Sequence, residues 1–214
     1  MTEKIPARWY FDVVSPYAYL YRRRFAALHP ALAVESVPVL FAGLLKHWDN
    51  KGPAEIVPKR LHTYRSCVWV ASRHAIPFRM PPRHPFNPLH VQRLLTGLGA
   101  APAAIDAAFD FVFAEGRDVG DEWPALCERL GVGLAQADAL CADPAVKERL
   151  AANTAQAAAE GVFGVPTLVV RGQCFWGNDT IEWANAFIDD PAMFDSGEMQ
   201  RVAAIEVAAR RRQA

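Results

Sequence analysis

The chain has 214 residues, 52% of them hydrophobic and 21% charged, a composition typical of a globular protein with a sizeable core. Lysine plus arginine equals aspartate plus glutamate at 23 residues each, so no net charge draws the whole chain to nucleic acid or to a membrane surface. No apolar run approaches the roughly 18 residues needed to span a bilayer, and the first residues, MTEKIPARWYF, lack the basic and apolar regions of a signal peptide.

The N-terminal part of the sequence predicts a strand, a helix and a second strand. Aromatic and β-branched residues indicate a strand near 8–14, and apolar residues at helical spacing indicate a helix near 16–29 that stops before Pro30. The segment LAVESVPVL, residues 32–40, predicts another strand, interrupted by Pro38. Two strands joined by one helix make a βαβ unit, and its right-handed crossover leaves the strands parallel.

The middle of the chain, residues 41–160, predicts helices rather than strands. The segment FRMPPRHPFNP, residues 78–88, must be an extended loop because it is rich in proline. The predicted helices have apolar residues at 3-4 spacing; one follows Pro58, with Leu61, Tyr64, Val68 and Ala71 on one face, and the others cover about 88–98, 102–116, 124–130 and 143–160.

The C-terminal part returns to strands and a helix. Residues 167–170 are apolar and β-branched and predict a strand, 171–173 a turn, and 174–176 the partner strand of a hairpin. Asp179, with Glu182 three residues later, predicts the start of the final core helix. Beyond it, FDSGEMQRVAAIEVAARRRQA predicts a helix that either docks on the core or extends as a free tail.

The order of these elements predicts an α/β protein with a thioredoxin-like fold. A βαβ unit at the front and a ββα unit at the back are the two halves of such a domain. We therefore predict a discontinuous thioredoxin-like domain of residues 1–40 and 161–214, interrupted by a large all-helical insertion domain of residues 41–160.

The cysteines bear on both compartment and chemistry. Cys67, Cys127, Cys141 and Cys174 lie far apart without a C-x-x-C pair, and the histidines are spread equally thinly, so no metal site is predicted. Reduced thiols in a cytoplasmic protein are the simplest interpretation. We expect Cys174 to be a small buried hydrophobic residue rather than a nucleophile.

Ser15 lies where the first predicted strand meets its helix. A serine followed by proline commonly begins a helix, because the hydroxyl accepts from a free amide and proline has no amide to leave unpaired. In a thioredoxin-like fold this is the place of the redox C-x-x-C, and here the tetrapeptide is Ser15-Pro16-Tyr17-Ala18. Without cysteine it cannot exchange disulfides, and without an adjacent histidine Ser15 is a poor nucleophile. Its hydroxyl can still donate to a thiolate that a ligand supplies.

Three segments of the sequence together resemble one enzyme family. WYFDVVSPYAYL, GPAEIVPKRLHTYR and GVFGVPTLVVRGQCFWGND resemble the 2-hydroxychromene-2-carboxylate isomerase family, whose members depend on glutathione and act in aromatic hydrocarbon catabolism. That family is similar to the kappa-class glutathione transferases and to the bacterial DsbA-like disulfide oxidoreductases. The three segments extend from the first predicted strand to the last hairpin, so the resemblance covers nearly the whole chain.

The resemblance implies a glutathione site around Ser15. It implies that Ser15 is the catalytic residue that holds and polarises the glutathione sulfur, and that Val165-Pro166 is a cis peptide whose backbone pairs with the cysteinyl part. The alternative for Pro166 is an ordinary strand start. The remaining glutathione contacts implied by the family are Trp176, Gly177, Asn178 and Asp179.

Asp179 has two possible roles, which do not exclude each other. At a helix N-terminus its carboxylate could accept from the α-ammonium of the γ-glutamyl group, while free amides there bind the γ-glutamyl carboxylate. Alternatively, Asp179 only caps the helix.

The resemblance also implies a substrate side formed by the helical insertion. Lys46 and Asn50 fall where the family places ligand contacts, and a lysine suits an anionic substrate, although a single lysine is commonly a solvated surface charge. Phe86 and Asn87 match an aromatic-Asn pair of the family; if that aromatic residue is a tyrosine that bonds the substrate, Phe86 cannot do so and the substrate differs. Trp48 and Trp69 line an aromatic pocket or belong to the core.

The leading functional prediction is therefore glutathione-dependent cis-trans isomerisation of 2-hydroxychromene-2-carboxylate, or a related aromatic, to trans-o-hydroxybenzylidenepyruvate. A kappa-like transferase that conjugates glutathione to an electrophile is one alternative, and a thioredoxin-like binding protein without active thiols is another. The expected partners are a small aromatic substrate and a second copy in a homodimer, with neither nucleic acid nor membrane.

Overall fold

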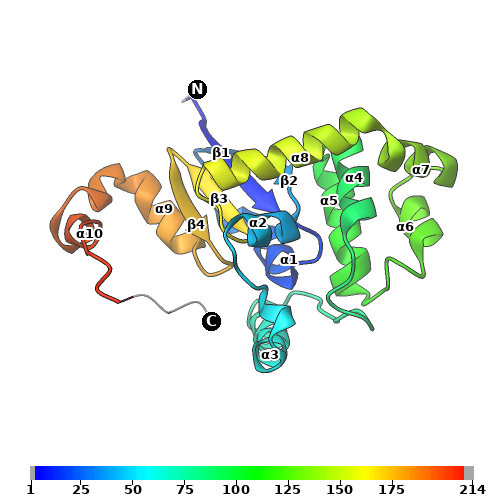
Figure 1. Cartoon of the computed structure of the whole chain (residues 1–214), viewed down its shortest axis with the longest axis horizontal. Coiled ribbons are helices and arrows are strands. Elements are labelled where there is room, and N and C mark those ends of the chain that lie inside the picture. The colour runs from blue at the N-terminus through cyan, green and yellow to red at the C-terminus, as the bar shows by residue number, and fades with distance from the viewer. Residues whose placement is uncertain (1–2, 210–214) are drawn as a thin grey trace.

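Figure 1 shows the computed structural model of the chain, in which residues 3–209 are described. A four-stranded sheet with strand order β2-β1-β3-β4 lies at the centre, and helices cover both of its faces. The strands are β1 (Ile5–Phe11), β2 (Leu32–Pro38), β3 (Thr167–Val170) and β4 (Gln173–Trp176). β1 pairs in parallel with β2 and antiparallel with β3, and β3 and β4 form an antiparallel hairpin. The predicted α/β fold, βαβ followed by ββα, is confirmed.

The helices are α1 (Pro16–Arg22), α2 (Phe41–His47), α3 (Val57–Arg73), α4 (Leu89–Gly97), α5 (Pro102–Phe109), α6 (Trp123–Arg129), α7 (Leu134–Ala142), α8 (Pro144–Ala159), α9 (Ile181–Asp189) and α10 (Gly197–Val202). Short 3-10 turns occur at η1 (Phe25–Ala27), η2 (Pro53–Glu55) and η4 (Pro191–Phe194), and a π-helical turn, η3 (Asp110–Ala114), continues α5. Among residues 3–209, none of the helices has the length and apolar character needed to cross a membrane.

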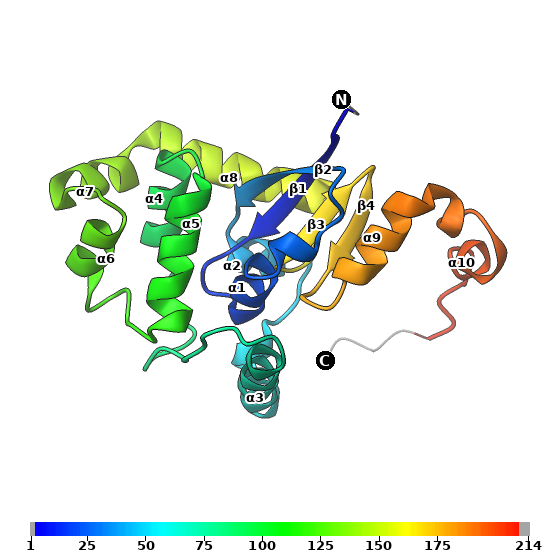
Figure 2. The same ribbon diagram turned by 180° about the vertical axis from the view of Figure 1, so that it is seen from behind.

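Side chains alternate along β1 and enter two different cores. Trp9 and Phe11 belong to the larger core, which includes buried residues of α1, α5 and α9 (Figure 2). Tyr10 belongs to a smaller core, together with Leu44 of α2 and Ala157 of α8. Two helices of the predicted insertion thus pack directly against residues of the sheet. The boundaries of the two predicted domains stay a prediction.

The first strand and the first helix both end earlier than predicted. β1 ends at Phe11 because Asp12 turns the chain: its carboxylate accepts from the Val14 N–H at 3.0 Å and its carbonyl accepts from the Ser15 N–H at 3.0 Å. The helix ends at Arg22 instead of near residue 29, since a 3-10 turn brings the Phe25 ring edge-on to Trp9, with centroids 4.9 Å apart.

Most helices of the middle segment were predicted within a few residues, but α2 and α7 were missed. They are seven and nine residues long, too short for a clear helical repeat of apolar residues. The proline-rich loop before α4 is non-helical, as predicted.

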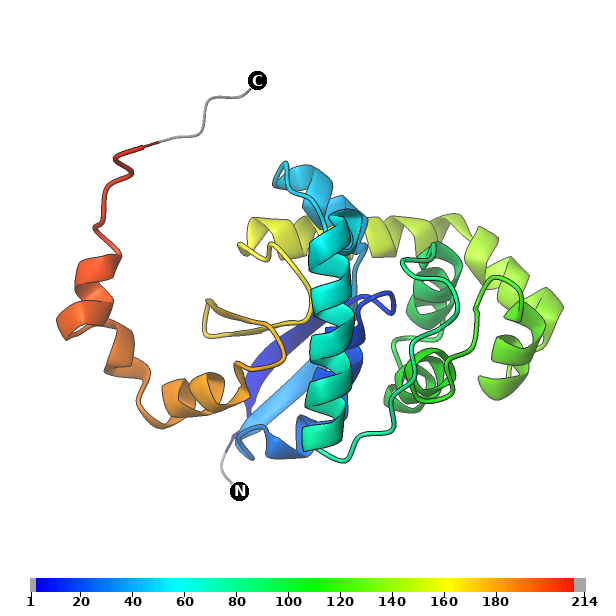
Figure 3. The same ribbon diagram turned by 90° about the horizontal axis from the view of Figure 1, so that it is seen from below.

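The apolar face predicted for α3 is only partly buried. Ala71 is buried and Tyr64 half-buried, whereas Leu61 and Val68 are more than half exposed. α3 meets the rest of the protein mainly through α1 and the 3-10 turn η2, and it crosses below the sheet without another helix beside it (Figure 3). Its outer side therefore stays in solvent.

Two expectations about the C-terminal part are wrong. Thr180, not Asp179, is the N-cap residue of α9, and no side chain makes a capping hydrogen bond there. The helix predicted from residue 194 onward forms only at α10, because Val202, Ile205 and Val207 are exposed and no buried face sustains a longer helix. Residues 210–214 of that prediction lie outside the described residues.

Candidate active site

Ser15 is the N-cap residue of α1, as predicted. Its Oγ accepts from the Ala18 N–H at 3.2 Å and donates to the Val165 carbonyl at 3.4 Å. The side chain is buried, with 7% of its surface exposed. The hydroxyl therefore joins the N-terminus of a helix to a segment that lies 150 residues later in the chain.

Val165 and Pro166 lie directly before β3. The Val165–Pro166 peptide bond is cis, as the resemblance implied. Val165 is buried, yet within residues 3–209 no protein group accepts a hydrogen bond from its N–H. An amide left without a partner loses a hydrogen bond, so a ligand that supplies an acceptor at this point is favoured.

The segment from Trp176 to Asp179 follows β4 and is anchored to this part of the site. The Gly177 N–H donates to the Pro166 carbonyl at 2.9 Å, and Arg24 donates to the Asn178 carbonyl at 2.8 Å. Asn178 is buried, whereas Asp179 is exposed just before the first turn of α9. This segment thus places the Asp179 carboxylate beside the backbone amides of the first turn of α9.

Exposed aromatic rings surround the Val165 segment. The indole of Trp176 is half exposed and packs edge-to-face against the Phe163 ring, with ring centroids 5.0 Å apart. Trp48 donates its indole N–H to the Val162 carbonyl at 2.9 Å. Trp48 is exposed rather than part of the core, and with the other two rings it forms an apolar rim beside the segment before Val165.

The residues predicted for the substrate side lie on two separate segments. Lys46 in the last turn of α2 and Asn50 just after it are both exposed, and Trp48 between them ties this segment to the Val165 loop. Phe86 is half-buried in the larger core, and the side-chain oxygen of Asn87 accepts from the Leu89 N–H at 3.0 Å, at the start of α4.

Trp69 and Cys174, the two other residues considered in the sequence, are not part of the Ser15 site. Trp69 is 65% exposed and borders a surface hollow of about 440 Å³ on α3, so it does not belong to the core. Cys174 is half-buried, its thiol donates to the Glu160 carbonyl at 3.3 Å, and burial raises the pKa of that thiol. Such a thiol is a poor nucleophile at neutral pH, in line with the prediction.

Asp12 holds the turn that leads to Ser15. The side chain is fully buried; one oxygen accepts from the Val14 N–H at 3.0 Å and the other from the Phe41 N–H, the first residue of α2, at 2.9 Å. Burial raises the pKa of Asp12 to about 7, against the opposing effect of the two N–H bonds. Asp12 thus fastens both the Ser15 turn and the start of α2.

Gln92 of α4 holds the same turn from the other side. Its side chain is fully buried, donates to the carbonyls of Phe11 at 3.1 Å and Val39 at 2.7 Å, and accepts from the Val13 N–H at 3.3 Å. His84, from the proline-rich loop, makes a further contact with the Val14 carbonyl at 2.7 Å.

Only one weak local signal marks these supporting residues. Asp12 is a single charge at the end of an apolar run, whereas nothing local marks Gln92 or His84, whose contacts depend on how α4 and the loop fold back. His84 does not activate Ser15 as a base, because its ring bonds the Val14 carbonyl and the Ser15 hydroxyl bonds the Val165 carbonyl. The geometry suits a hydroxyl donor to a bound anion rather than a nucleophile.

Comparison with known families and curated proteins gives one family match and several relatives. The family described as DSBA-like thioredoxin domain matches residues 8–189. The chain is 28% identical over 190 residues to a 2-hydroxychromene-2-carboxylate isomerase of Sphingobium xenophagum, covering 85% of this chain and 97% of that protein. It is 31% identical over 87 residues to glutathione s-transferase kappa 2 of Caenorhabditis elegans, covering 38% of this chain and 37% of that protein.

Solved structures show the same fold. A structure of 2-hydroxychromene-2-carboxylate isomerase superposes with a TM-score of 0.75 at 22% identity, covering 89% of this chain and 98% of that one. The cytosolic disulfide reductase DsbM of Pseudomonas aeruginosa, solved with GSH, superposes with a TM-score of 0.58 at 16% identity, covering 89% and 98%.

Proposed function

The chain belongs to the DsbA-like thioredoxin domain family, and from that premise we propose that it is a glutathione-dependent isomerase of 2-hydroxychromene-2-carboxylate or a related aromatic anion. One observation carries the proposal: a serine hydroxyl, fixed between the first turn of α1 and the Val165 carbonyl, occupies the place of the family's redox cysteines. Relatives named as this isomerase match almost their whole length, which supports the same reaction class.

The residues around Ser15 fit glutathione. The free N–H of buried Val165 is able to pair with the cysteinyl part of the tripeptide as a strand pairs with a sheet edge. Asp179 would accept from the α-ammonium group, with Trp176, Gly177 and Asn178 around the same end. When bound, glutathione supplies a thiolate that adds reversibly to the substrate and leaves after bond rotation.

Ser15 would lower the pKa of that thiol by turning its one hydroxyl proton from the Val165 carbonyl, 3.4 Å away, to the sulfur. Its hydroxyl and the amides of the first turn of α1 favour negative charge, so a larger fraction of the thiol is ionised at neutral pH. The burial of the hydroxyl strengthens this interaction, because water competes for it less.

On the substrate side, Lys46 would bind the carboxylate, with Asn50 beside it, and Trp48, Phe163 and Trp176 would cover the aromatic ring. Phe86 and Asn87 reach the site only through His84 and the start of α4, so we expect weaker effects from them.

The test is conversion of 2-hydroxychromene-2-carboxylate, followed by ultraviolet absorbance with and without glutathione. We expect turnover only with glutathione and a loss of about 10²–10³-fold in kcat for Ser15→Ala, the range for removing one hydrogen-bond donor from a developing anion. Ser36→Ala on β2 is the matched control and should keep full activity. Turnover without glutathione, or full activity of Ser15→Ala, would contradict the proposal.

Conjugation of glutathione to an electrophile is the second candidate, favoured by the similarity to a kappa glutathione transferase. The two activities differ in the fate of glutathione, which an isomerase regenerates and a transferase consumes. Measuring free thiol during turnover separates them. If glutathione does not bind at all, a thioredoxin-like binding protein without enzyme activity becomes the better description.

The expectations of a homodimer and of a cytoplasmic protein stay predictions. A cytoplasmic location would suit the proposed reaction, because the cytosol keeps glutathione and the four free cysteines reduced. Light scattering of the purified protein measures its oligomeric state, and fractionation of the source cells determines its location.

A further inference from the structure

His84 forms a hydrogen-bonded bridge between helix α3 and the Ser15 turn. Its Nε2 lies 2.7 Å from the Val14 carbonyl, and its Nδ1 lies 2.7 Å from the hydroxyl of Tyr64 on α3. A carbonyl only accepts, so Nε2 carries the proton. Burial lowers the pKa of His84, which leaves Nδ1 as an acceptor for the Tyr64 hydroxyl. The Val14 carbonyl thus fixes the tautomer, and Tyr64 holds the ring through Nδ1 in the orientation that donates to Val14.

The orientation of the imidazole is fixed by packing as well. Tyr64 and Phe86 stand edge-on to the ring, with centroids 5.2 Å and 6.0 Å away, and Phe113 packs at 6.3 Å. The Tyr64 hydroxyl also lies 2.8 Å from the backbone carbonyl of His84, so both acceptors of this residue face one donor. The donor Nε2–H is therefore held in one direction.

The bond from His84 to the Val14 carbonyl is one of four hydrogen bonds that hold the backbone of the Ser15 turn. Gln92 binds the Val13 N–H, the Asp12 carboxylate binds the Val14 N–H, and the Asp12 carbonyl binds the Ser15 N–H. The Val14 carbonyl belongs to the peptide plane that ends at Ser15, and His84 is its partner. Without that bond only the Ser15 N–H bond to the Asp12 carbonyl holds this plane, so the plane and the Ser15 hydroxyl are less firmly oriented.

We propose that His84, oriented by Tyr64, is a positioning residue that sets the direction of the Ser15 hydroxyl toward a bound thiolate. The inference rests on the proposed function for the thiolate, but the contact itself exists without any ligand. It also gives α3 a part in the site through Tyr64, although the outer side of this helix faces solvent.

Three substitutions test the bridge. His84→Leu removes the donor to Val14, and His84→Gln keeps an amide N–H that can reach the same carbonyl. Tyr64→Phe removes only the hydroxyl that holds Nδ1 of the ring. His74→Leu, at the exposed end of α3, is the matched control.

The first readout is hydrogen exchange of the amides of residues 14, 15 and 17–19 in the free protein. We expect faster exchange in His84→Leu, a smaller increase in Tyr64→Phe, and exchange close to wild type in His84→Gln and in the control. Unchanged exchange in His84→Leu, or equal exchange in the Leu and Gln variants, overturns the proposal. Tyr64→Phe keeps the ring, so it provides a folded test if His84→Leu does not fold.

The second readout is the pKa of the thiol of bound glutathione, followed by thiolate absorbance against pH. We expect it to rise by about one in His84→Leu, with about tenfold lower kcat at neutral pH and little change in substrate KM. His84→Gln should restore both values. An unchanged thiol pKa with normal binding overturns the proposal. If the wild-type protein does not bind glutathione, the proposed function fails, and hydrogen exchange still decides the positioning role.

Discussion

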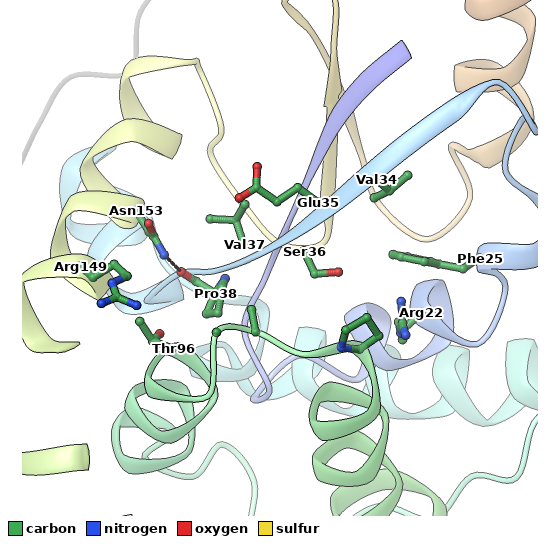
Figure 4. A pocket seen from close by; sticks show the side chains of 13 residues that line it. Arg22, Phe25, Val34, Glu35, Ser36, Val37, Pro38, Thr96, Arg149 and Asn153 are labelled. Atoms are coloured by element: carbon green, nitrogen blue, oxygen red, sulfur yellow. Dashed lines mark hydrogen bonds between the residues drawn. The ribbon is translucent and has the colours of Figure 1, made fainter. Parts of the chain in front are cut away.

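The Ser15 site and the groove beside β2 differ in which groups they leave free for a ligand. The groove has a volume of about 490 Å³ and lies between β2 and the helices α4, α5 and α8 (Figure 4). Arg22 at one end is paired with Asp106 through two bonds of 2.6 and 2.8 Å, and Asn153 at the other end donates to the Pro38 carbonyl at 3.1 Å. Around Ser15, by contrast, the N–H of buried Val165 has no acceptor among residues 3–209.

The difference teaches that an open groove and a set of backbone groups free for a ligand are separate features of this fold. In the groove, the Arg22 and Asn153 side chains join elements to one another. At the Ser15 turn, buried side chains hold the backbone, so that the hydroxyl and the helix amides point to one place. The predictions below test that division of roles.

The largest effect is expected from Gln92, whose side chain serves three backbone groups of the Ser15 turn and its neighbours. Gln92→Leu leaves the Val13 N–H and the Val39 carbonyl unpaired, while the Phe11 carbonyl keeps its bond from the Val39 N–H, so the free energy of unfolding should fall by about 5 kcal/mol. Thr96→Val, one turn later on α4 and lining the groove, removes a single bond to the Gln92 carbonyl and should cost about 1 kcal/mol. Urea unfolding measures both, and equal losses would contradict the difference between the two regions.

Asp12 should make stability depend on pH. Its pKa of about 7 in the folded chain exceeds that of an unfolded aspartate, so the folded state binds the proton more tightly. The stabilisation is complete below about pH 4 and is lost as pH rises through 7, a change of about 4 kcal/mol at most. Asp12→Asn should remove this slope from unfolding curves, whereas Asp106→Asn, which breaks the pair with Arg22 beside the groove, should retain it. The lowered pKa of His84 adds an opposite slope to every variant, so the difference between wild type and Asp12→Asn is what counts, and equal slopes in the two would refute the assignment.

Much of the fold was predictable because its signals are local. The hairpin, the βαβ unit and the long helices show their periodicity and breakers in the sequence, and Ser15-Pro16 marks the start of α1. The site was predictable only where a motif carries it, as around Val165 and Trp176. Gln92, His84 and Tyr64 act through contacts with residues far away in the chain, which no local pattern encodes.

Helix ends and caps were the weakest part of the prediction. Phe25 turns out of α1 because the Trp9 ring offers it a packing partner, and that partner lies on a strand. Asp179 has the right spacing for a cap, but α9 begins one residue later than that spacing requires. In the first case a tertiary contact decided between local alternatives, and in the second the start of the helix differs by one residue.

A moderate effect is expected from the approach of Gly164 to Trp176. A Cβ at Gly164 would lie 2.6 Å from the indole nitrogen of Trp176, so the half-exposed ring must move away. Gly164→Ala should therefore weaken glutathione binding about tenfold, or about 1.4 kcal/mol, with a smaller change in the melting temperature. Isothermal titration measures the affinity. Gly133→Ala is the control, since a Cβ there meets no atom within 4 Å; equal affinities for the two variants would exclude a role for Trp176.

The smallest effect is expected in the groove itself. Asn153→Ala removes the donor to the Pro38 carbonyl, but the groove is open and water can take over the bond, so the cost should be about 0.5–1 kcal/mol. Glutathione affinity and turnover should stay at the wild-type level, because Pro38 ends β2 and the Ser15 turn is held by other side chains. A tenfold loss of turnover in Asn153→Ala, with stability preserved, would make the groove part of the active site. If Asn153→Ala keeps wild-type activity and loses only this small amount of stability, the role of Asn153 is to join α8 to β2 and not to take part in catalysis.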